Sequence, residues 1–180
     1  MIRPDLNEDL WIFGYGSLMW NPGFDHEEVV GGTVHGFYRS LCVRSTLYRG
    51  TPDNPGLVLG LDEGGSCTGR VFRVTAENVT ATMVYLDERE QINEVYCPQF
   101  VPTKLHDGRE VTAYTYVVRR EHRQYVQLSV DEQASLVAQG IGNRGTAMDY
   151  LANTIEHMDA LGIKDTDLHR VFAKAQALSA

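Results

Sequence analysis

Short apolar runs interrupted by glycine occupy the first two thirds of the chain. Residues 10–13, with the sequence LWIF, end at Gly14, a pattern typical of a buried strand that enters a turn. Residues 29–43, 56–61 and 66–74 are rich in β-branched and aromatic side chains, which favours strands that bend within a strongly curved sheet. We therefore expect several strands in this part of the chain.

The sequence also predicts a β-hairpin. Two strand-like segments, residues 95–105 and 109–119, flank the tripeptide His106-Asp107-Gly108. An Asp-Gly pair between two such segments is among the strongest local signals for a tight turn between antiparallel strands. Residues 48–56, YRGTPDNPG, contain the glycine and proline residues of a loop instead.

A helix is predicted from Thr75 to about Glu90. Thr75 can cap its start, and apolar side chains recur at helical spacing, at Val79, Met83 and Leu86. Steps of about 100° per residue place Glu90 in the middle of this apolar stripe. The same steps place Glu88 on the opposite, solvent-facing side of the helix.

The last third of the chain predicts further helices. Ser129 and Glu132 have the spacing of a capping box, and Gly140 marks the end of that helix. Two apolar stripes follow: Met148, Leu151, Ile155 and Met158, which end at Gly162, and then Leu168, Val171, Phe172 and Ala175. Because strands dominate before residue 120 and helices after it, the order favours an α+β fold with a curved or closed sheet over alternating parallel βαβ units.

Length and charge narrow the possible partners. The 180 residues, of which 43% are hydrophobic and 22% charged, suit a single domain over residues 1–180. Sixteen lysine and arginine residues against 24 aspartate and glutamate residues give a net charge of −8. An acidic surface repels phosphate backbones, so we expect no nucleic acid partner.

The expected location is the cytoplasm. The first residues, MIRPDLNEDLWIF, include acidic side chains where a signal peptide needs a basic region and an apolar stretch. No segment approaches the roughly 20 apolar residues of a membrane span, so no membrane association is expected. Cys42, Cys67 and Cys97 are an odd number of cysteines without a C-x-x-C pair, which predicts reduced thiols.

The glycine loop GYGSL at residues 14–18 is the first candidate site. It directly follows a predicted strand, and its glycines allow successive backbone N–H groups to approach a ligand and form an anion-binding nest. It is not a dinucleotide motif, because Met19 stands at the third glycine position, and it is not a nucleophile elbow, because Ser17 lies in G-S-L. A plain tight turn is the alternative.

Glu90 is the second candidate. A carboxylate within an apolar stripe loses hydration, so its pKa rises toward the range that suits proton transfer, as a catalytic general base requires. The alternatives are a helix that frays before Glu90 and a structural ion pair with Arg89 or Arg119.

Other polar side chains are candidates for substrate or metal binding. Arg39, Arg44 and Arg49 recur at intervals of five, so one or more could clamp a substrate carboxylate, while solvated arginines at a strand edge are the alternative. Tyr15 and Tyr96 are the tyrosines that we single out for binding. The six histidines include no pair at metal-binding helical spacing, so no metal is expected.

The sequence contains two further patterns that resemble known functional motifs. A literal G-x-G-x-x-G occurs at residues 140–145, but it lacks the preceding strand that dinucleotide binding requires, and we interpret it as a loop between helices. Cys97 and His106 lie in one predicted hairpin, which leaves a thiol hydrolase as a different enzyme class, although no nucleophile motif surrounds them.

Four features together resemble the ChaC family of γ-glutamylcyclotransferases. They are FGYGSLMWNPGF at residues 13–24, R-x-x-x-x-RGTPDNPG at residues 44–56, YLDERE at residues 85–90, and the later Tyr96. The resemblance extends from about residue 10 to about residue 165. It implies a mixed β-barrel-like sheet with flanking helices, no cofactor, and a substrate with a γ-glutamyl group, usually glutathione.

The resemblance also implies roles for individual residues. In this chemistry the α-amine of the γ-glutamyl unit attacks its own γ-carbonyl, which yields 5-oxoproline and, from glutathione, Cys-Gly. Glu90 would serve as general base and then general acid. The loop residues Tyr15, Gly16, Ser17 and Leu18 would hold the γ-glutamyl end, and Arg44 and Tyr96 are further candidates for substrate binding.

Two other functions stay open from the sequence. A glycine pair usually follows the R-E dipeptide in the eukaryotic glutathione-degrading branch, whereas Gln91 and Ile92 follow it here, and the spacing from Glu90 to Tyr96 resembles the bacterial branch. A cyclotransferase for other γ-glutamyl dipeptides or γ-glutamyl-amines is therefore one alternative. A non-catalytic module that binds a γ-glutamyl metabolite or a partner protein is the other.

Overall fold

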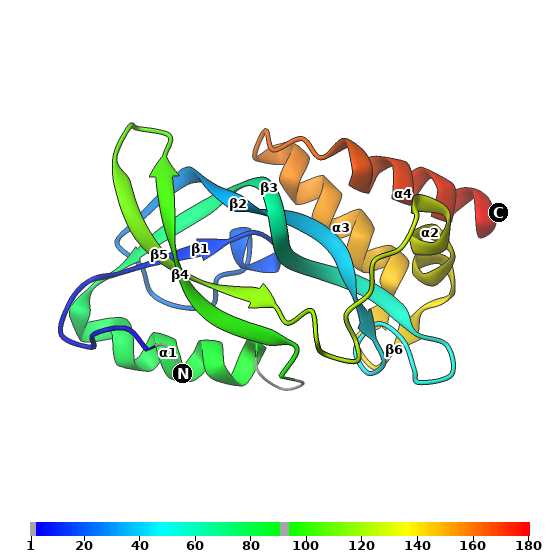
Figure 1. Cartoon of the computed structure of the whole chain (residues 1–180), viewed down its shortest axis with the longest axis horizontal. Coiled ribbons are helices and arrows are strands. Elements are labelled where there is room, and N and C mark those ends of the chain that lie inside the picture. Colours follow the sequence, from blue (N-terminus) through cyan, green and yellow to red (C-terminus); the bar gives the residue numbers. More distant parts are fainter. Residues whose placement is uncertain (1–2, 91–93) are drawn as a thin grey trace. The chain divides into compact units, whose positions relative to one another are not determined.

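The computed structural model describes residues 3–90 and 94–180, and within them five strands close into a barrel (Figure 1). In the order β1-β3-β2-β4-β5 around the barrel, β1 pairs antiparallel with β3 and parallel with β5, so the sheet is mixed. The strands are β1 (Leu10–Gly14), β2 (Glu28–Ser45), β3 (Gly56–Val74), β4 (Tyr96–Leu105) and β5 (Glu110–Val118). The predicted curved or closed sheet is confirmed.

Helices complete the α+β fold. They are the 3-10 helix η1 (Ser17–Met19), α1 (Ala76–Glu90), α2 (Val130–Gln139), α3 (Ala147–Ala160) and α4 (Thr166–Leu178). α1 reaches Glu90 as predicted, so the alternative of earlier fraying is wrong. Ser129 and Glu132 form the predicted capping box of α2, because each side chain accepts a hydrogen bond from the backbone of the other.

The hairpin prediction is confirmed, whereas the prediction of two strands between residues 56 and 74 is wrong. β4 and β5 pair antiparallel around a turn in which Gly108 has a φ of 96°. β3 is one strand of 19 residues. Gly64 and Gly65 lie within it at φ values of 118° and 54°, which side chains with a Cβ rarely adopt. The glycine pair therefore bends the strand where we expected an interruption.

The described residues group into two compact units. The first comprises Met1–Arg39 and Leu61–Arg119, and the second comprises Ser40–Gly60 and Arg120–Ala180. β2 and β3 each supply residues to both units. The single domain expected from chain length stays a prediction.

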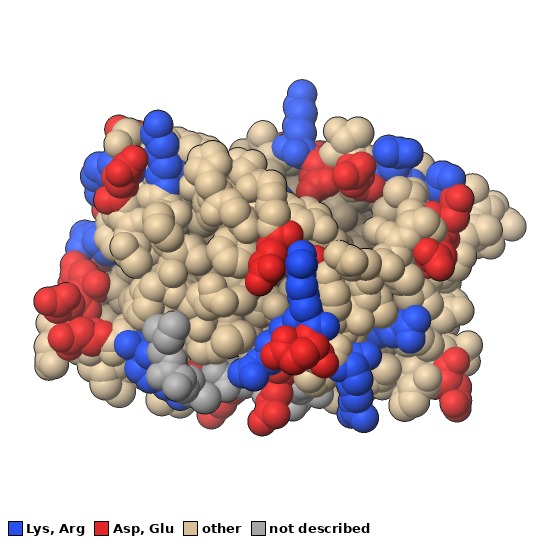
Figure 2. All heavy atoms as spheres, viewed as in Figure 1, with Lys and Arg blue, Asp and Glu red and all other residues tan. Residues whose placement is uncertain are grey.

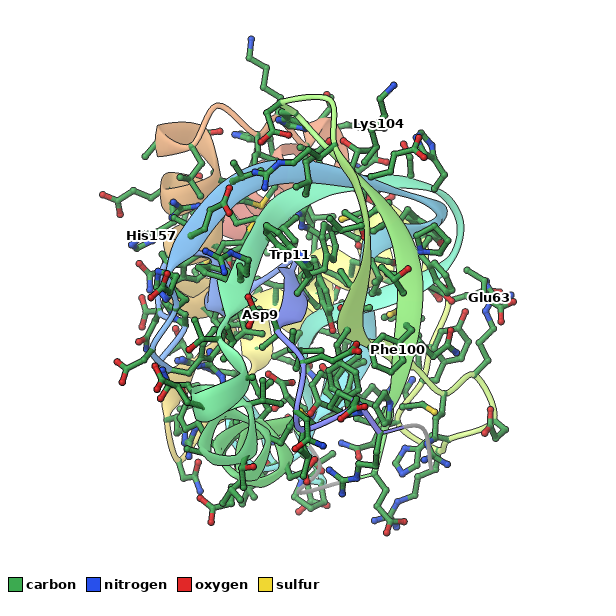
Figure 3. All side chains as sticks on the ribbon, turned by 90° about the vertical axis from the view of Figure 1, so that its left-hand side faces the viewer. Asp9, Trp11, Glu63, Phe100, Lys104 and His157 are labelled. Carbon is green, nitrogen blue, oxygen red and sulfur yellow. The ribbon has the colours of Figure 1, made fainter. Side chains whose placement is uncertain are left out.

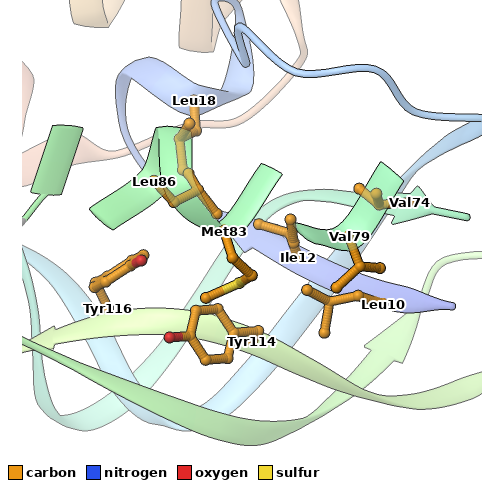
Figure 4. Packing of buried hydrophobic residues seen from close by; sticks show 9 residues of the cluster. All are labelled: Leu10, Ile12, Leu18, Val74, Val79, Met83, Leu86, Tyr114 and Tyr116. Carbon is orange, nitrogen blue, oxygen red and sulfur yellow. The ribbon is translucent and has the colours of Figure 1, made fainter. Parts of the chain in front are cut away.

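In the first unit, α1 packs its apolar stripe against β1 and β5 (Figure 4). Figure 4 shows Met83 directed at Tyr114, and Leu86 next to Leu18 of the glycine loop. The buried cluster consists of Leu10, Ile12, Leu18, Val74, Val79, Met83, Leu86, Tyr114 and Tyr116. Burying such side chains stabilises a fold by about 1.5–3 kcal/mol each, so this cluster fixes the position of α1.

In the second unit, α4 packs against α2 and α3. The G-x-G-x-x-G segment forms two very short paired strands, β6 (Ile141–Gly142) and β7 (Gly145–Thr146), between α2 and α3. The segment lies between two helices as predicted, but it forms a small pair of strands where we expected a loop.

Charged side chains of both signs lie beside one another over the face that Figure 2 shows. Among the described helices, none combines the length and the apolar character that crossing a lipid bilayer requires.

Candidate active site around the glycine loop and the end of helix α1

The glycine loop forms a tight turn between β1 and η1 in the first unit. The carbonyl of Gly16 accepts a hydrogen bond from the amide of Met19 at 2.9 Å, and the carbonyl of Ser17 accepts one from the amide of Asn21 at 2.9 Å. The amides of Ser17 and Leu18 precede the first bond of this turn, so they have no acceptor within it. Gly16 and Ser17 are partly exposed, and the turn therefore has backbone donors at an accessible place.

Two arginines fix this loop to the barrel strands. Arg39 on β2 is buried, and its guanidinium donates to the carbonyl of Tyr15 at 2.6 Å and to the carbonyl of Thr68 at 2.7 Å. Arg70 on β3 donates to the carbonyl of Met19 at 3.1 Å. Tyr15 in the loop and Met19 directly after it are thus held by charge-assisted hydrogen bonds, which are stronger than neutral ones.

Glu90 is the last residue of α1 and continues its buried stripe. Leu86, one turn earlier, is fully buried, while Glu88 is exposed, as the helical spacing predicts. The side chain of Glu90 is only 18% exposed. Burial raises the pKa of this carboxyl, and the neighbouring Arg89 guanidinium offsets part of that rise.

Arg89 connects the end of α1 to the glycine loop. Its Nε lies 3.5 Å from a carboxylate oxygen of Glu90, and its Nη2 donates to the hydroxyl of Ser17 at 2.6 Å. Its Nη1 donates to the hydroxyl of Tyr85 at 2.7 Å and to the carbonyl of Asn21 at 2.8 Å. One guanidinium therefore contacts both of the sites that the sequence singled out.

Tyrosines from β4 and β5 surround the same region. Tyr96 is partly buried and packs against the cluster that contains Leu18, Leu86 and Tyr116. Burial raises the pKa of Tyr116, and the charge of Glu90 adds to this rise, so the two groups interact electrostatically. Within the first unit the structure thus brings Tyr15, Gly16, Ser17, Leu18, Glu90 and Tyr96 into one region.

Arg44 and Arg49 belong to the second unit. Arg44 has an exposed side chain, and its backbone exchanges hydrogen bonds of 2.8 Å with Gln124. Arg49 donates to the carbonyl of Arg144 at 2.6 Å and lies over the ring of Tyr150. The reading of strand-edge arginines in solvent is therefore wrong for Arg39 and Arg49, because both hold loops of their own units.

The segment RGTPDNPG is a close backbone junction within the second unit. A Cβ atom added at Gly56 would lie 2.0 Å from the carbonyl oxygen of Arg49, and one added at Gly50 would lie 2.1 Å from the amide nitrogen of Gly56. Real Cβ atoms do not approach so closely, so both positions require glycine. This segment, which contributed to the family resemblance, thus has a packing role.

The hairpin does not bring Cys97 and His106 together. Cys97 stands at the start of β4, while His106 follows its last residue. Figure 3 shows the Phe100 end of this strand near α1 and the Lys104 end away from it. The thiol hydrolase alternative is therefore wrong. Cys42, Cys67 and Cys97 are free, as predicted.

Two further expectations concern the residues that follow Glu90 and the binding of metals. Gln91 and Ile92, on which the comparison of branches rests, lie outside the described residues. In the part of the chain that the structure describes, no three histidine, cysteine, aspartate or glutamate side chains converge as a metal ion would require.

Sequence reasoning missed the roles of Arg39 and Arg89. A sequence signal existed for Arg39. It lies at a spacing of two residues with the apolar Phe37, Leu41 and Val43 along β2, and such residues share one side of a strand. For Arg89 the only local signal was its spacing of four residues from Tyr85. Its partner Ser17 is 72 residues away, and local spacing does not identify such a contact.

Comparison with solved structures defines the class of fold. A crystal structure from yeast, described as a γ-glutamyl cyclotransferase specific to glutathione, superposes with a TM-score of 0.86 over 95% of this chain and 97% of that chain. The two sequences are 22% identical, so this likeness establishes the fold alone. The protein thus has the same fold as this yeast protein. In this chain, the glycine loop lies beside the buried Glu90.

Comparison of sequences then establishes the family. The chain matches the ChaC-like protein family over residues 10–177. It is 36% identical to the glutathione-specific γ-glutamylcyclotransferase of Escherichia coli, over 99% of this chain and 77% of that protein. It is 32% identical to the protein of the same name in Schizosaccharomyces pombe, over 89% of this chain and 88% of that protein. The chain belongs to the ChaC-like family.

Proposed function

We propose that this protein is a glutathione-specific γ-glutamylcyclotransferase, which converts glutathione to 5-oxoproline and Cys-Gly. The observation that supports this most directly is the 36% identity, over 99% of the chain, to the E. coli protein of that name. The partner is then a small-molecule substrate, and the proposed reaction needs no cofactor. The cytoplasmic location expected from the sequence stays a prediction.

The reaction is an internal substitution in which the substrate supplies the nucleophile. The α-amine of the γ-glutamyl unit attacks the γ-carbonyl carbon, and a five-membered lactam closes as the bond to the cysteine nitrogen breaks. No water is consumed, so the atoms of glutathione divide between 5-oxoproline and Cys-Gly. Because the attack is intramolecular, a pocket that folds the substrate supplies several kcal/mol of the barrier reduction.

Glu90 is the proposed general base and acid. An α-ammonium has a pKa of about 8 and cannot attack while protonated, so a base must remove its proton and then protonate the leaving nitrogen. Burial of Glu90 supports this role, because it raises the pKa of the carboxyl toward the working range of such a catalyst. The contacts of Arg89 with both Glu90 and Ser17 support a base beside the glycine loop.

The glycine loop is the proposed binding site for the γ-glutamyl end. The amides of Ser17 and Leu18, which precede the first bond of the turn, are suited to stabilise the negative oxygen that forms at the γ-carbonyl. Tyr15, Gly16 and Tyr96 would complete the binding surface. A contact between Arg44 and a substrate carboxylate stays a prediction.

Product analysis in labelled water tests this function. The purified chain is incubated with glutathione in H₂¹⁸O, and products are identified by mass spectrometry. We expect 5-oxoproline and Cys-Gly in equal amounts, with no ¹⁸O in the 5-oxoproline, because cyclisation takes no oxygen from water. A parallel panel of γ-glutamyl dipeptides and γ-glutamyl-amines measures selectivity.

Three results would contradict the proposal. Glutamate that carries ¹⁸O would indicate a hydrolase. A preference for a γ-glutamyl-amine over glutathione would indicate a different cyclotransferase. Binding of glutathione without any product would indicate a non-catalytic module.

A further inference from the structure

Arg89 makes contacts that an ordinary structural ion pair does not need. Its guanidinium donates to the Ser17 hydroxyl of the glycine loop, to the Tyr85 hydroxyl of its own helix and to the carbonyl of Asn21 beyond η1. Its remaining nitrogen, Nε, faces Glu90 at 3.5 Å. The side chain is 19% exposed. It is therefore held in one orientation by partners on three separate segments.

We propose that Arg89 is a positioning residue, whose guanidinium holds the Ser17 side of the glycine loop and the carboxylate of Glu90 in one arrangement, so that a substrate bound on the loop meets the base. The inference rests on the proposed function. It extends that function by giving a role to a residue that does not itself exchange protons with the substrate.

The chemistry of arginine suits this task. The guanidinium is planar and has five N–H donors in a fixed fork, so it can serve several acceptors in set directions, whereas a lysine ammonium cannot match that geometry. The position near the C-terminus of α1 also favours a cation, because the helix dipole is negative there. Tyr85 supports the orientation from one turn earlier on the same helix.

The charges around Glu90 are consistent with this role. Arg89 faces Glu90 from α1 and lowers the pKa of its carboxyl, which burial alone would raise further. Tyr116 faces it from β5 and stays neutral, because burial raises the pKa of its hydroxyl. The charge of Asp87 raises the pKa of Tyr116 further. Arg3, which pairs with Asp87 at 2.5 Å, also interacts electrostatically with this tyrosine. Removing Arg89 would thus leave Glu90 without the cation that favours its ionised form.

The test compares Arg89→Gln and Arg89→Lys with the wild-type protein in the conversion of glutathione, measured as kcat/KM against pH. In Arg89→Gln we expect the acidic limb to move to higher pH, so that kcat/KM at pH 6 relative to its plateau falls at least about threefold. KM should also rise, because Ser17 loses its partner. Arg89→Lys keeps the charge, so its acidic limb should stay near that of the wild type while KM rises.

Arg109→Gln is the matched control. Arg109 lies at the turn of the hairpin between β4 and β5, where its guanidinium pairs with the carboxylates of Glu28 on β2 and Asp107. Its loss should leave both the pH profile and KM unchanged. A second control is the double variant Ser17→Ala/Arg89→Gln. Its two effects on KM should not add, because both substitutions remove the same contact, the hydrogen bond between Arg89 and Ser17. Additive effects on KM, or an unmoved acidic limb in Arg89→Gln, would overturn the inference.

A titration followed by NMR separates this inference from the proposed function. The ¹³C signal of the Glu90 carboxyl, assigned by its loss in Glu90→Gln, is followed against pH in each variant. We expect a higher midpoint in Arg89→Gln and an unchanged midpoint in Arg109→Gln. Equal midpoints would refute the arrangement even if 5-oxoproline forms. A wild-type chain that forms no 5-oxoproline would refute the function, whatever the midpoints are.

Discussion

Glu90 lowers the stability of the folded protein at neutral pH. Burial disfavours its charged form, so its pKa is higher in the folded than in the unfolded chain. Such a carboxyl stabilises the fold fully below its unfolded pKa of about 4.3, and this contribution disappears as the pH rises through its folded pKa. An active-site residue that reduces stability in this way is a common feature of enzymes.

This cost predicts the effect of a neutral replacement. Glu90→Gln should raise the free energy of unfolding at pH 7 by about 1 kcal/mol, and the gain should shrink toward pH 4, where the wild-type carboxyl is protonated as well. Urea unfolding at both pH values measures it. Glu88→Gln, at an exposed position of the same helix, should change little at either pH. A Glu90→Gln variant less stable than the wild type at pH 7 would show that burial is not the dominant effect.

Individual residues differ in how far the sequence determined their roles. The place of Glu90 followed from helical spacing, because the apolar stripe of α1 is a local pattern. The contacts of Arg39 with Tyr15 and of Arg89 with Ser17 did not, because these partners lie 24 and 72 residues away along the sequence. Arg44 has a known place on β2, while its role in binding stays a prediction.

At the scale of elements, the proposed function assigns substrate binding to the backbone of the glycine loop. Arg39 fixes the carbonyl of Tyr15 in the loop, and Arg70 fixes the carbonyl of Met19 directly after it. In the proposed function, the early amides of the turn face the ligand. Ser17→Ala removes one side-chain contact but keeps those amides, so KM for glutathione should rise only a few-fold.

A side chain at Gly16 should have a different effect, because in the proposed function the substrate lies against the backbone there, and a side chain would occupy its space. Gly16→Val should therefore reduce kcat/KM far more than Ser17→Ala, by about a hundredfold or more. Steady-state kinetics of both variants, with circular dichroism to verify folding, measures the difference. Equal effects of the two substitutions would argue against a binding site made of backbone amides.

Local signals predicted most elements, while long-range pairing decided the others. The Asp-Gly turn, the capping box of α2 and the periodicity of α1 each lie within a few residues, and all three formed as expected. β3 did not, because the Gly64-Gly65 pair looked like a break but bends within a continuous strand. The neighbours of a strand in the barrel, and not its own residues alone, determine whether it continues.

At the scale of the whole molecule, the family match covers both units, whereas the proposed site uses residues of the first unit. The match to the ChaC-like family extends over residues 10–177 and includes the second unit, with its close glycine junction at Gly50 and Gly56. The proposed chemistry uses the glycine loop and Glu90, which both belong to the first unit. In the second unit, the residues that match the family include the glycines of this close backbone junction, which have a packing role.

The central claim is that one buried carboxylate moves protons while a bound γ-glutamyl peptide cyclises. The most direct measurement is the rate of 5-oxoproline formation from glutathione by the wild-type chain, Glu90→Gln and Glu88→Gln under the same conditions. We predict that Glu90→Gln stays folded and loses at least about a hundredfold in turnover, while Glu88→Gln keeps the wild-type rate. A Glu90→Gln variant that forms 5-oxoproline as fast as the wild type would contradict the account.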